Sequence, residues 1–261
     1  MDYALITGVA LVVSGLTLFS GFGLGTLLMP GFALFFPVPT AIAATAVVHL
    51  ANNLFKLALV GRNASWPVVM RFSVPAALAA LLGASVLVGF AGLEPLTSYT
   101  AFGRSFEITP VKLVIGSLIV AFAALELSPA FATLTIPSRY LPLGGLLSGF
   151  FGGLSGNQGA FRSAFLIKAG LGKQAFVATG VVSAVIVDSV RLTVYGLSTF
   201  VTSFEALPPE IVGLVVSASL AAFAGAFFGT RLLEKVTLRA VQITVAACMI
   251  GVGAGLVAGW I

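Results

Sequence analysis

Two charged residues stand three positions apart inside a long apolar run. Asp188 and Arg191 lie within AFVATGVVSAVIVDSVRLTVYG, and residues with this spacing share one face of a helix. An ionised carboxylate inside a membrane costs about 2.5–3.5 kcal/mol on insertion scales unless it is paired. Two interpretations remain open: a structural ion pair that neutralises itself, or a substrate or proton site in which Arg191 faces an anion.

A comparable polar group occurs earlier in the chain. Asn53 and Lys56 have the same three-residue spacing, and His49 and Asn52 precede them by about one helical turn. This face could bind a substrate, or it could form hydrogen bonds between helices while the lysine reaches toward the lipid headgroups.

A glycine-rich break with polar side chains follows in SGFFGGLSGNQGAFRSAFLIK, residues 148–168. A helix that starts near Gln158 would direct free N–H groups and its positive end into the break. Backbone amides together with a guanidinium suit an anion. The candidate substrate-binding residues of this break are Ser155, Gly156, Asn157, Gln158, Gly159 and Arg162. The alternative role of the glycines is close helix packing, as the GxxxG spacing of Gly149 and Gly153 indicates.

A second break, SGFGLGTLLMPGFALFFPVP, holds four glycines and three prolines but almost no side-chain donors. Irregular backbone at membrane depth is tolerated where it lines a cavity or is buried in protein. Gly23 and Gly25 are therefore candidates for lining a substrate site, and helix packing is again the alternative.

The composition is that of a polytopic membrane protein. Hydrophobic residues make up 59% of 261, charged residues 8%, and mean hydropathy is +1.14, whereas soluble domains carry about 25% charged residues. The net charge of +5 is too small and scattered to indicate nucleic acid. Cys248 and His49 are each the only residue of their type, so we expect no metal site and no cofactor. No nucleophile–base pair is visible, so we do not expect an enzyme.

Apolar runs of membrane-spanning length predict an all-α fold in a single membrane domain, residues 1–261. The runs fall at 3–20, 39–60, 68–91, 110–127, 139–155, 174–197, 208–230 and 238–260, with shorter ones at 23–36 and 159–170.

The chain also repeats itself at an offset of 134 to 135 residues. The informative matches pair Gly25 with Gly159, Asn53 with Asp188, and Lys56 with Arg191. We therefore predict two repeats, 1–127 and 139–261.

Loop charge predicts how the repeats are related. Eight simple spans would place seven basic residues on one side of the membrane and four on the other, but if each break is a turn the split becomes nine to two. The second split fits the positive-inside rule better. It makes the halves inverted repeats, each a glycine-rich broken hairpin plus three transmembrane helices, an architecture of secondary transporters. The nine are Lys56, Arg62, Arg71, Arg139, Lys168, Lys173, Arg231, Lys235 and Arg239, and the two are Arg104 and Lys112.

The chain resembles the TauE/SafE sulfite-exporter family, also called the toluene-sulfonate uptake permease family. The resemblance rests on GFGLGTLLMP, on PTAIAATAVVHLANNLFKLALVGR, and on SGFFGGLSG at the head of the second half, and it covers essentially the whole chain. It implies movement of sulfite, sulfonates or related organosulfur anions across the inner membrane. One departure concerns the substrate: Pro30 follows the first set of glycines as in the family, but the second set has no such proline, and Arg162 stands near that place.

These observations together predict a multi-pass secondary transporter of the inner membrane for a small sulfur-oxyanion or sulfonate. No ATPase motif occurs, so an ion gradient or the substrate's own gradient would drive it. Arg162 and the amides of residues 156–159 would bind the anion. The alternatives are an anion channel, a transporter for a small carboxylate, and a membrane assembly factor that carries nothing. Expected partners are a small anion and lipid, with coupled protons or sodium and a homo-oligomer left open.

Overall fold

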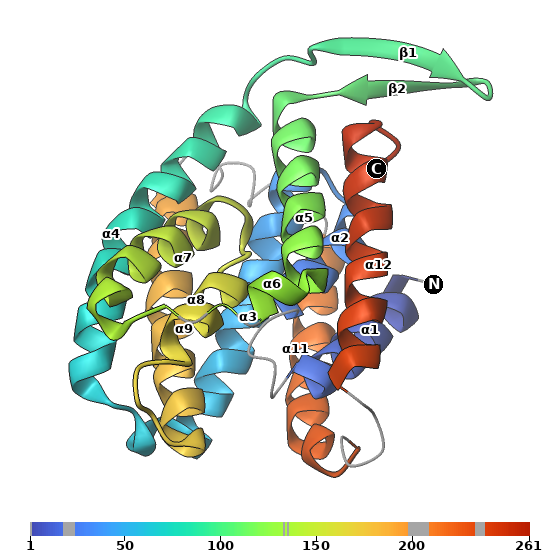
Figure 1. Cartoon of the computed structure of the whole chain (residues 1–261). Coiled ribbons are helices and arrows are strands. Elements are labelled where there is room, and N and C mark those ends of the chain that lie inside the picture. Colours follow the sequence, from blue (N-terminus) through green and yellow to red (C-terminus); the bar gives the residue numbers. More distant parts are fainter. Residues whose placement is uncertain (1, 18–23, 133, 135, 198–208, 233–237) are drawn as a thin grey trace.

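The computed structural model describes the chain except residues 1, 18–23, 133, 135, 198–208 and 233–237. The described part is a bundle of helices with one β-hairpin at its upper end (Figure 1). The helices are α1 (Asp2–Thr17), α2 (Leu24–Ala33), α3 (Val38–Val60), α4 (Trp66–Ala91), α5 (Pro110–Leu127), α6 (Pro129–Ala132), α7 (Leu141–Ser155), α8 (Gly159–Leu166), α9 (Lys173–Leu197), α11 (Pro209–Leu232) and α12 (Leu238–Val257). The strands are β1 (Thr97–Ala101) and β2 (Arg104–Ile108), and short 3-10 turns occur at Gly61–Asn63 and Ser138–Tyr140.

The helices follow the predicted apolar runs within a few residues. Among the described residues, five helices are long and apolar enough to cross a membrane, so the prediction of a helical multi-pass membrane protein is confirmed. They cover Val38–Asn63, Trp66–Ala91, Pro110–Leu127, Lys173–Gly196 and Ile211–Phe228, and shorter apolar helices cover Tyr3–Gly15 and Ile243–Val257.

The hairpin of β1 and β2 was not predicted. The strands pair antiparallel with Tyr99 opposite Phe106, and Phe102 and Gly103 form the two-residue turn with φ angles of 53° and 74°. Two positive φ values in a two-residue turn match the twist of antiparallel strands. The fold is therefore helical with one β element, where the sequence analysis expected only helices.

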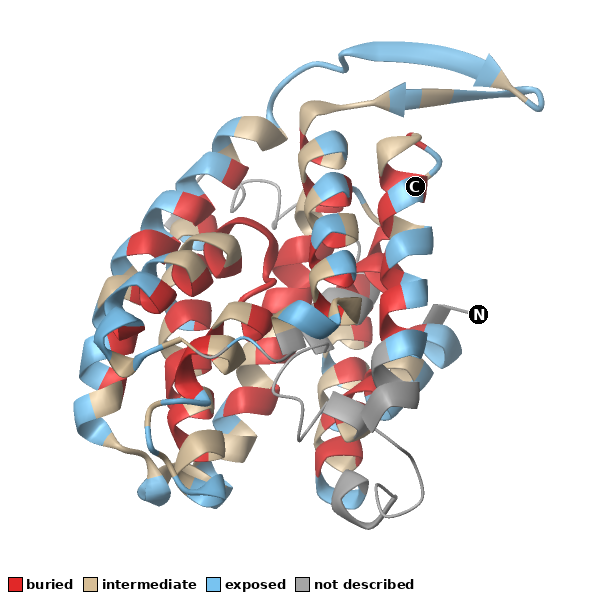
Figure 2. Cartoon of the chain, viewed as in Figure 1, coloured by how far each residue is buried: buried red, intermediate tan, exposed pale blue. Residues whose placement is uncertain are grey.

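The central helices α3 and α9 run antiparallel. Ser65, just beyond the end of α3, donates its backbone N–H to Thr179 near the start of α9 at 3.0 Å. Farther into both helices, His49 and Asn53 contact Asp188. Around this pair, α4 packs on α7 and α9, α1 packs on α11, α11 packs on α3, and α5 packs on α12. Figure 2 shows that the buried residues line the inner sides of these helices, while the hairpin is largely exposed.

Glycines allow close contact between the outer helix pairs. A Cβ at Gly145, Gly149 or Gly153 of α7 would collide with the backbone of α4. A Cβ at Gly225 of α11 would likewise collide with the carbonyl of Leu11 in α1. Packing is therefore the role of the Gly149/Gly153 pair, and these two glycines do not line the break itself.

Candidate functional site

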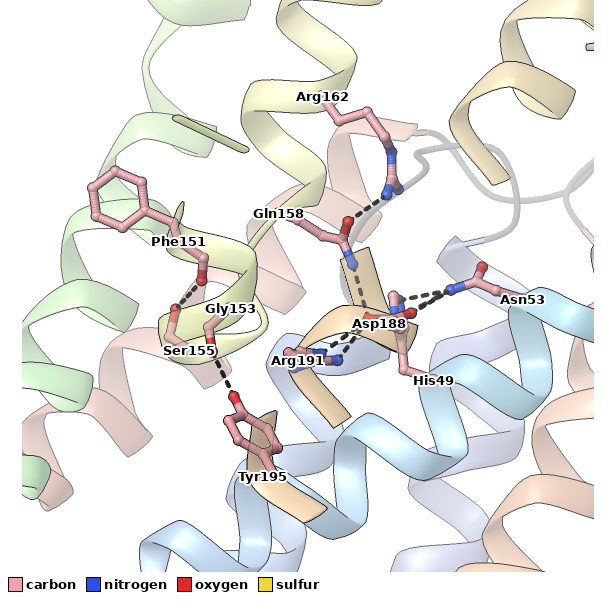
Figure 3. Close-up of polar contacts among 10 residues, drawn as sticks. All are labelled: His49, Asn53, Phe151, Gly153, Ser155, Gln158, Arg162, Asp188, Arg191 and Tyr195. Carbon is pink, nitrogen blue, oxygen red and sulfur yellow. Dashed lines mark hydrogen bonds and ion pairs between the residues drawn. The ribbon is translucent and has the colours of Figure 1, made fainter. Parts of the chain in front are cut away.

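Asp188 is the centre of a buried polar cluster formed by α3, α9 and the break between α7 and α8 (Figure 3). Its side chain is fully buried. One carboxylate oxygen, Oδ2, accepts hydrogen bonds from His49 Nδ1 at 2.7 Å and Asn53 Nδ2 at 3.2 Å. The other, Oδ1, accepts from Gln158 Nε2 and Arg191 Nε, each at 3.0 Å. Each of these donors favours the ionised form of the carboxylate.

Arg191 lies one helical turn beyond Asp188 and forms an ion pair with it, with Nη2 2.8 Å from Oδ1. The guanidinium is only 1% exposed, so it is buried in the protein rather than extended to its surface, as the sequence alone allowed. The backbone of Gly156 closely approaches its other terminal nitrogen: a Cβ at Gly156 would lie 2.8 Å from Nη1. With φ of 82°, this residue ends α7 in the left-handed region that favours glycine. Gly156 therefore shapes the break and lets it approach the arginine.

Gln158 connects this ion pair to Arg162. Arg162 Nη1 donates to Gln158 Oε1 at 3.2 Å, while the amide of Gln158 donates to Asp188. Arg162 is buried and lies one turn inside α8, which begins at Gly159, as the sequence predicted. The side chain of Gln158, the N-cap residue, makes no capping hydrogen bond to this helix. The first N–H groups of α8 have no intrahelical acceptor, so the helix presents its positive end beside the cluster.

The other candidates of this break make local contacts. Asn157 Nδ2 donates to Ser155 Oγ at 3.2 Å, and Ser155 Oγ donates to the carbonyl of Phe151 at 3.0 Å. Ser148 Oγ donates to the carbonyl of Gln158 at 2.8 Å. These bonds help to fix the shape of the break, so Ser155 and Asn157 lie beside the site.

On α3, the structure separates the predicted polar face into two parts. His49 and Asn53 contact Asp188, whereas Asn52 is buried with neither amide atom hydrogen-bonded among the described residues. Lys56 is half-buried and lies within electrostatic range of Arg162. Gly23 falls outside the described residues, and Gly25 lies in α2, where only its helical backbone is described.

Two residues of this region escaped the sequence analysis. Tyr195, one turn after Arg191, donates to the carbonyl of Gly153 at 2.5 Å and ties α9 to α7. Glu126 in α5 is 7% exposed, and its Oε2 has no hydrogen-bond partner among the described residues. Glu126 could have been noticed as the lone carboxylate of an apolar run. Tyr195 gave no such signal, because tyrosine is common in buried helices.

The cluster pairs one buried guanidinium with Asp188 and links a second, Arg162, to it through Gln158, with the half-buried Lys56 ammonium within electrostatic range of Arg162. Within the described residues, no group of three or more His, Cys, Asp or Glu side chains is placed to hold a metal ion. The described charges of the cluster are therefore mainly positive and rich in hydrogen-bond donors, which suits an oxyanion.

Comparison with known proteins identifies the family of this chain. The comparison with curated proteins finds no match to this chain. The family model described as "Sulfite exporter TauE/SafE" matches residues 5–256, which is nearly the whole chain. This protein therefore belongs to the TauE/SafE sulfite-exporter family, a family of membrane transporters.

Proposed function

We propose that the protein is a secondary transporter of the inner membrane that carries a small sulfur-oxyanion or sulfonate through the break between α7 and α8. The observation that supports this most is the linked arrangement of Arg162, Gln158, Asp188 and Arg191 at the uncapped start of α8. Broken helices with their N-terminal ends directed at anionic groups are characteristic of transporter sites.

The roles of the residues follow from their contacts. Arg162 is proposed to make a forked contact with two oxygens of the anion, because its planar guanidinium matches a sulfonate or carboxylate. The N–H groups at the start of α8 add donors from the backbone. Asp188 holds Arg191 and Gln158 in place. A change in which donors bind Asp188 would couple anion binding to a conformational change of the protein.

We further propose that the chain consists of two inverted repeats, 1–127 and 139–261. Three features support this. The predicted repeat-mates Asn53 and Asp188 touch each other, as residues beside a two-fold axis would. Their helices, α3 and α9, run antiparallel. The helix packing also follows the repeat, in which α1 corresponds to α7, α3 to α9 and α4 to α11. The contact of α1 with α11 then matches that of α7 with α4, and the contact of α3 with α11 matches that of α9 with α4.

A binding experiment tests the proposed site. In thermal-shift and calorimetric titrations of purified protein, we expect sulfite or a small sulfonate to bind, and we expect Arg162→Lys to weaken that binding by about 1.5–3 kcal/mol, or ten- to a hundred-fold. Lysine keeps the charge and loses the fork. Arg139→Lys is the matched control, because Arg139 lies in a 3-10 turn over the ring of Tyr140, away from the cluster. Equal affinity in the Arg162→Lys and Arg139→Lys proteins would remove Arg162 from the site. Binding of small carboxylates alone would reassign the substrate.

A further inference from the structure

The β1–β2 hairpin has one apolar and one polar face. Residues opposite each other in the register lie on the same face of a sheet, and successive residues alternate between faces. Tyr99 and Phe106 are such a pair, with ring centroids 5.5 Å apart. Their face also carries Thr97, Ala101, Arg104 and Ile108, whereas the other face carries Ser98, Thr100, Ser105 and Glu107.

The apolar face is the one directed toward the helix bundle. On this side the Tyr99 hydroxyl donates to the carbonyl of Ala258, just after α12, at 2.6 Å. At the base of the hairpin, Gly259 closely approaches the backbone of Glu107, since a Cβ there would lie 2.7 Å from its carbonyl oxygen. The hairpin connects α4 to α5, which are both long and apolar enough to span the membrane. A connection between two spans lies at a membrane boundary, and the apolar face of this hairpin is the one nearer the spans.

The outer half of the hairpin extends sideways beyond α12 (Figure 1). At its tip, Phe102 is 94% exposed and has a φ of 53°. A positive φ is uncommon for a bulky residue, and the turn type favours Asn-Gly instead. A ring this exposed makes little contact with the described part of the chain, so it is available for a contact outside it.

We infer that the outer half of the hairpin lies on the membrane surface, with Phe102 in the interfacial layer and Arg104 against lipid phosphates. Tryptophan and tyrosine concentrate at the headgroup level, and phenylalanine is among the residues that surface-lying segments bury at the boundary between headgroups and acyl chains. Trp260, which is 62% exposed, follows Gly259 at the same boundary. Arg104 lies on the membrane-facing side near the tip, where its guanidinium complements an anionic phosphate. This assignment does not depend on what the protein transports.

Tryptophan fluorescence in lipid nanodiscs tests the inference. Trp66 and Trp260, the two tryptophans of the chain, are replaced by phenylalanine, and a reporter is introduced as Phe102→Trp. Thr100→Trp on the polar face is the matched control within the same hairpin. We expect phosphatidylcholine brominated near the top of its acyl chains to quench Phe102→Trp severalfold more than Thr100→Trp. Aqueous iodide should give the reverse order.

Two outcomes would overturn the inference. If iodide quenches both reporters equally and bromolipid quenches neither, the tip lies in water. If neither quencher reaches Phe102→Trp, the tip is covered by protein, such as a second copy of the chain. Ala101→Trp, on the membrane-facing side, provides the same comparison if the Phe102→Trp protein does not fold.

Discussion

Four side chains donate hydrogen bonds to Asp188 from α3, from α9 and from the break that precedes α8. A buried carboxylate with this many donors is a structural hub, because its loss leaves several donors without an acceptor at once. The sequence allowed two interpretations of the Asp188/Arg191 pair, a structural ion pair or a substrate or proton site. The contacts of Asp188 to His49 and Gln158 make the pair part of a larger cluster. Structural and transport roles can be separated by comparing single and double variants.

Asp188→Asn should lower the free energy of unfolding by about 3–5 kcal/mol, because Arg191 would remain buried without its counter-charge. Asp188→Asn combined with Arg191→Gln should recover much of that stability, since neither charge is then left unpaired. Chemical denaturation in detergent measures both values. If the cluster also works in transport, the double variant folds yet carries no anion. Normal flux through it would assign the pair to structure alone.

The residues of the cluster were identifiable from the sequence because charged and amide side chains are rare in membrane spans. Their connections were not identifiable. Gln158 bridges Arg162 to Asp188 only because Gly156 turns the chain at the end of α7, and side-chain partners across 30 residues depend on that turn. Asn52 shows the same limit: it lies beside Asn53 in sequence but does not share its contact with Asp188.

At the scale of elements, the helix bounds were predictable because long apolar runs in a membrane must satisfy their own backbone hydrogen bonds. The hairpin was not predicted, although the alternation of Tyr99, Ala101 and Phe106 with polar neighbours is typical of strands. Its strands are five residues each and lie between two strong helical signals, so the sequence predicts only a connecting loop there. The sequence also does not distinguish glycines that pack between helices from glycines that line a cavity, since GxxxG spacing fits both roles equally.

Gly83 and Gly89 in α4 offer a matched test of glycine packing. A Cβ at Gly83 would collide with the carbonyl of Phe150 in α7, whereas at Gly89 nothing lies within 4 Å. Gly83→Ala should therefore lower the free energy of unfolding by about 1–3 kcal/mol through overpacking. Gly89→Ala should raise it, by up to about 1 kcal/mol, because alanine favours the helix. Denaturation of both proteins in the same detergent measures the difference, and equal effects would contradict the α4–α7 contact.

At the scale of the whole molecule, the repeat and the loop charges predict that the two halves are inverted. Neither signal predicts the contact between Asn53 and Asp188, because a repeat shows which residues correspond and not which of them are in contact. The inverted arrangement requires the turn after α3 and the turn before α9 to lie on one side of the membrane. It requires the hairpin to lie on the other.

Site-directed labelling measures this arrangement. In a Cys248→Ala background, cysteines at Asn63 and Gly172, both exposed, should react with a membrane-impermeant reagent from the cytoplasmic side, where basic loops are retained. A cysteine at Ser105 in the hairpin should react only from the opposite side. Labelling of Asn63→Cys and Gly172→Cys from different sides would contradict the inverted repeats.

Flux through purified protein tests the central claim most directly. In proteoliposomes with an imposed sulfite gradient, the unaltered protein should carry sulfite into the vesicles. The rate of uptake should saturate as the sulfite concentration rises, as it does for a carrier. Arg162→Ala should lose this uptake, because the forked contact to the anion is removed, while Arg139→Ala keeps it. Each protein is first shown by size-exclusion chromatography to be folded. A folded Arg162→Ala protein that carries sulfite at the rate of the Arg139→Ala protein would contradict an anion site at the break between α7 and α8.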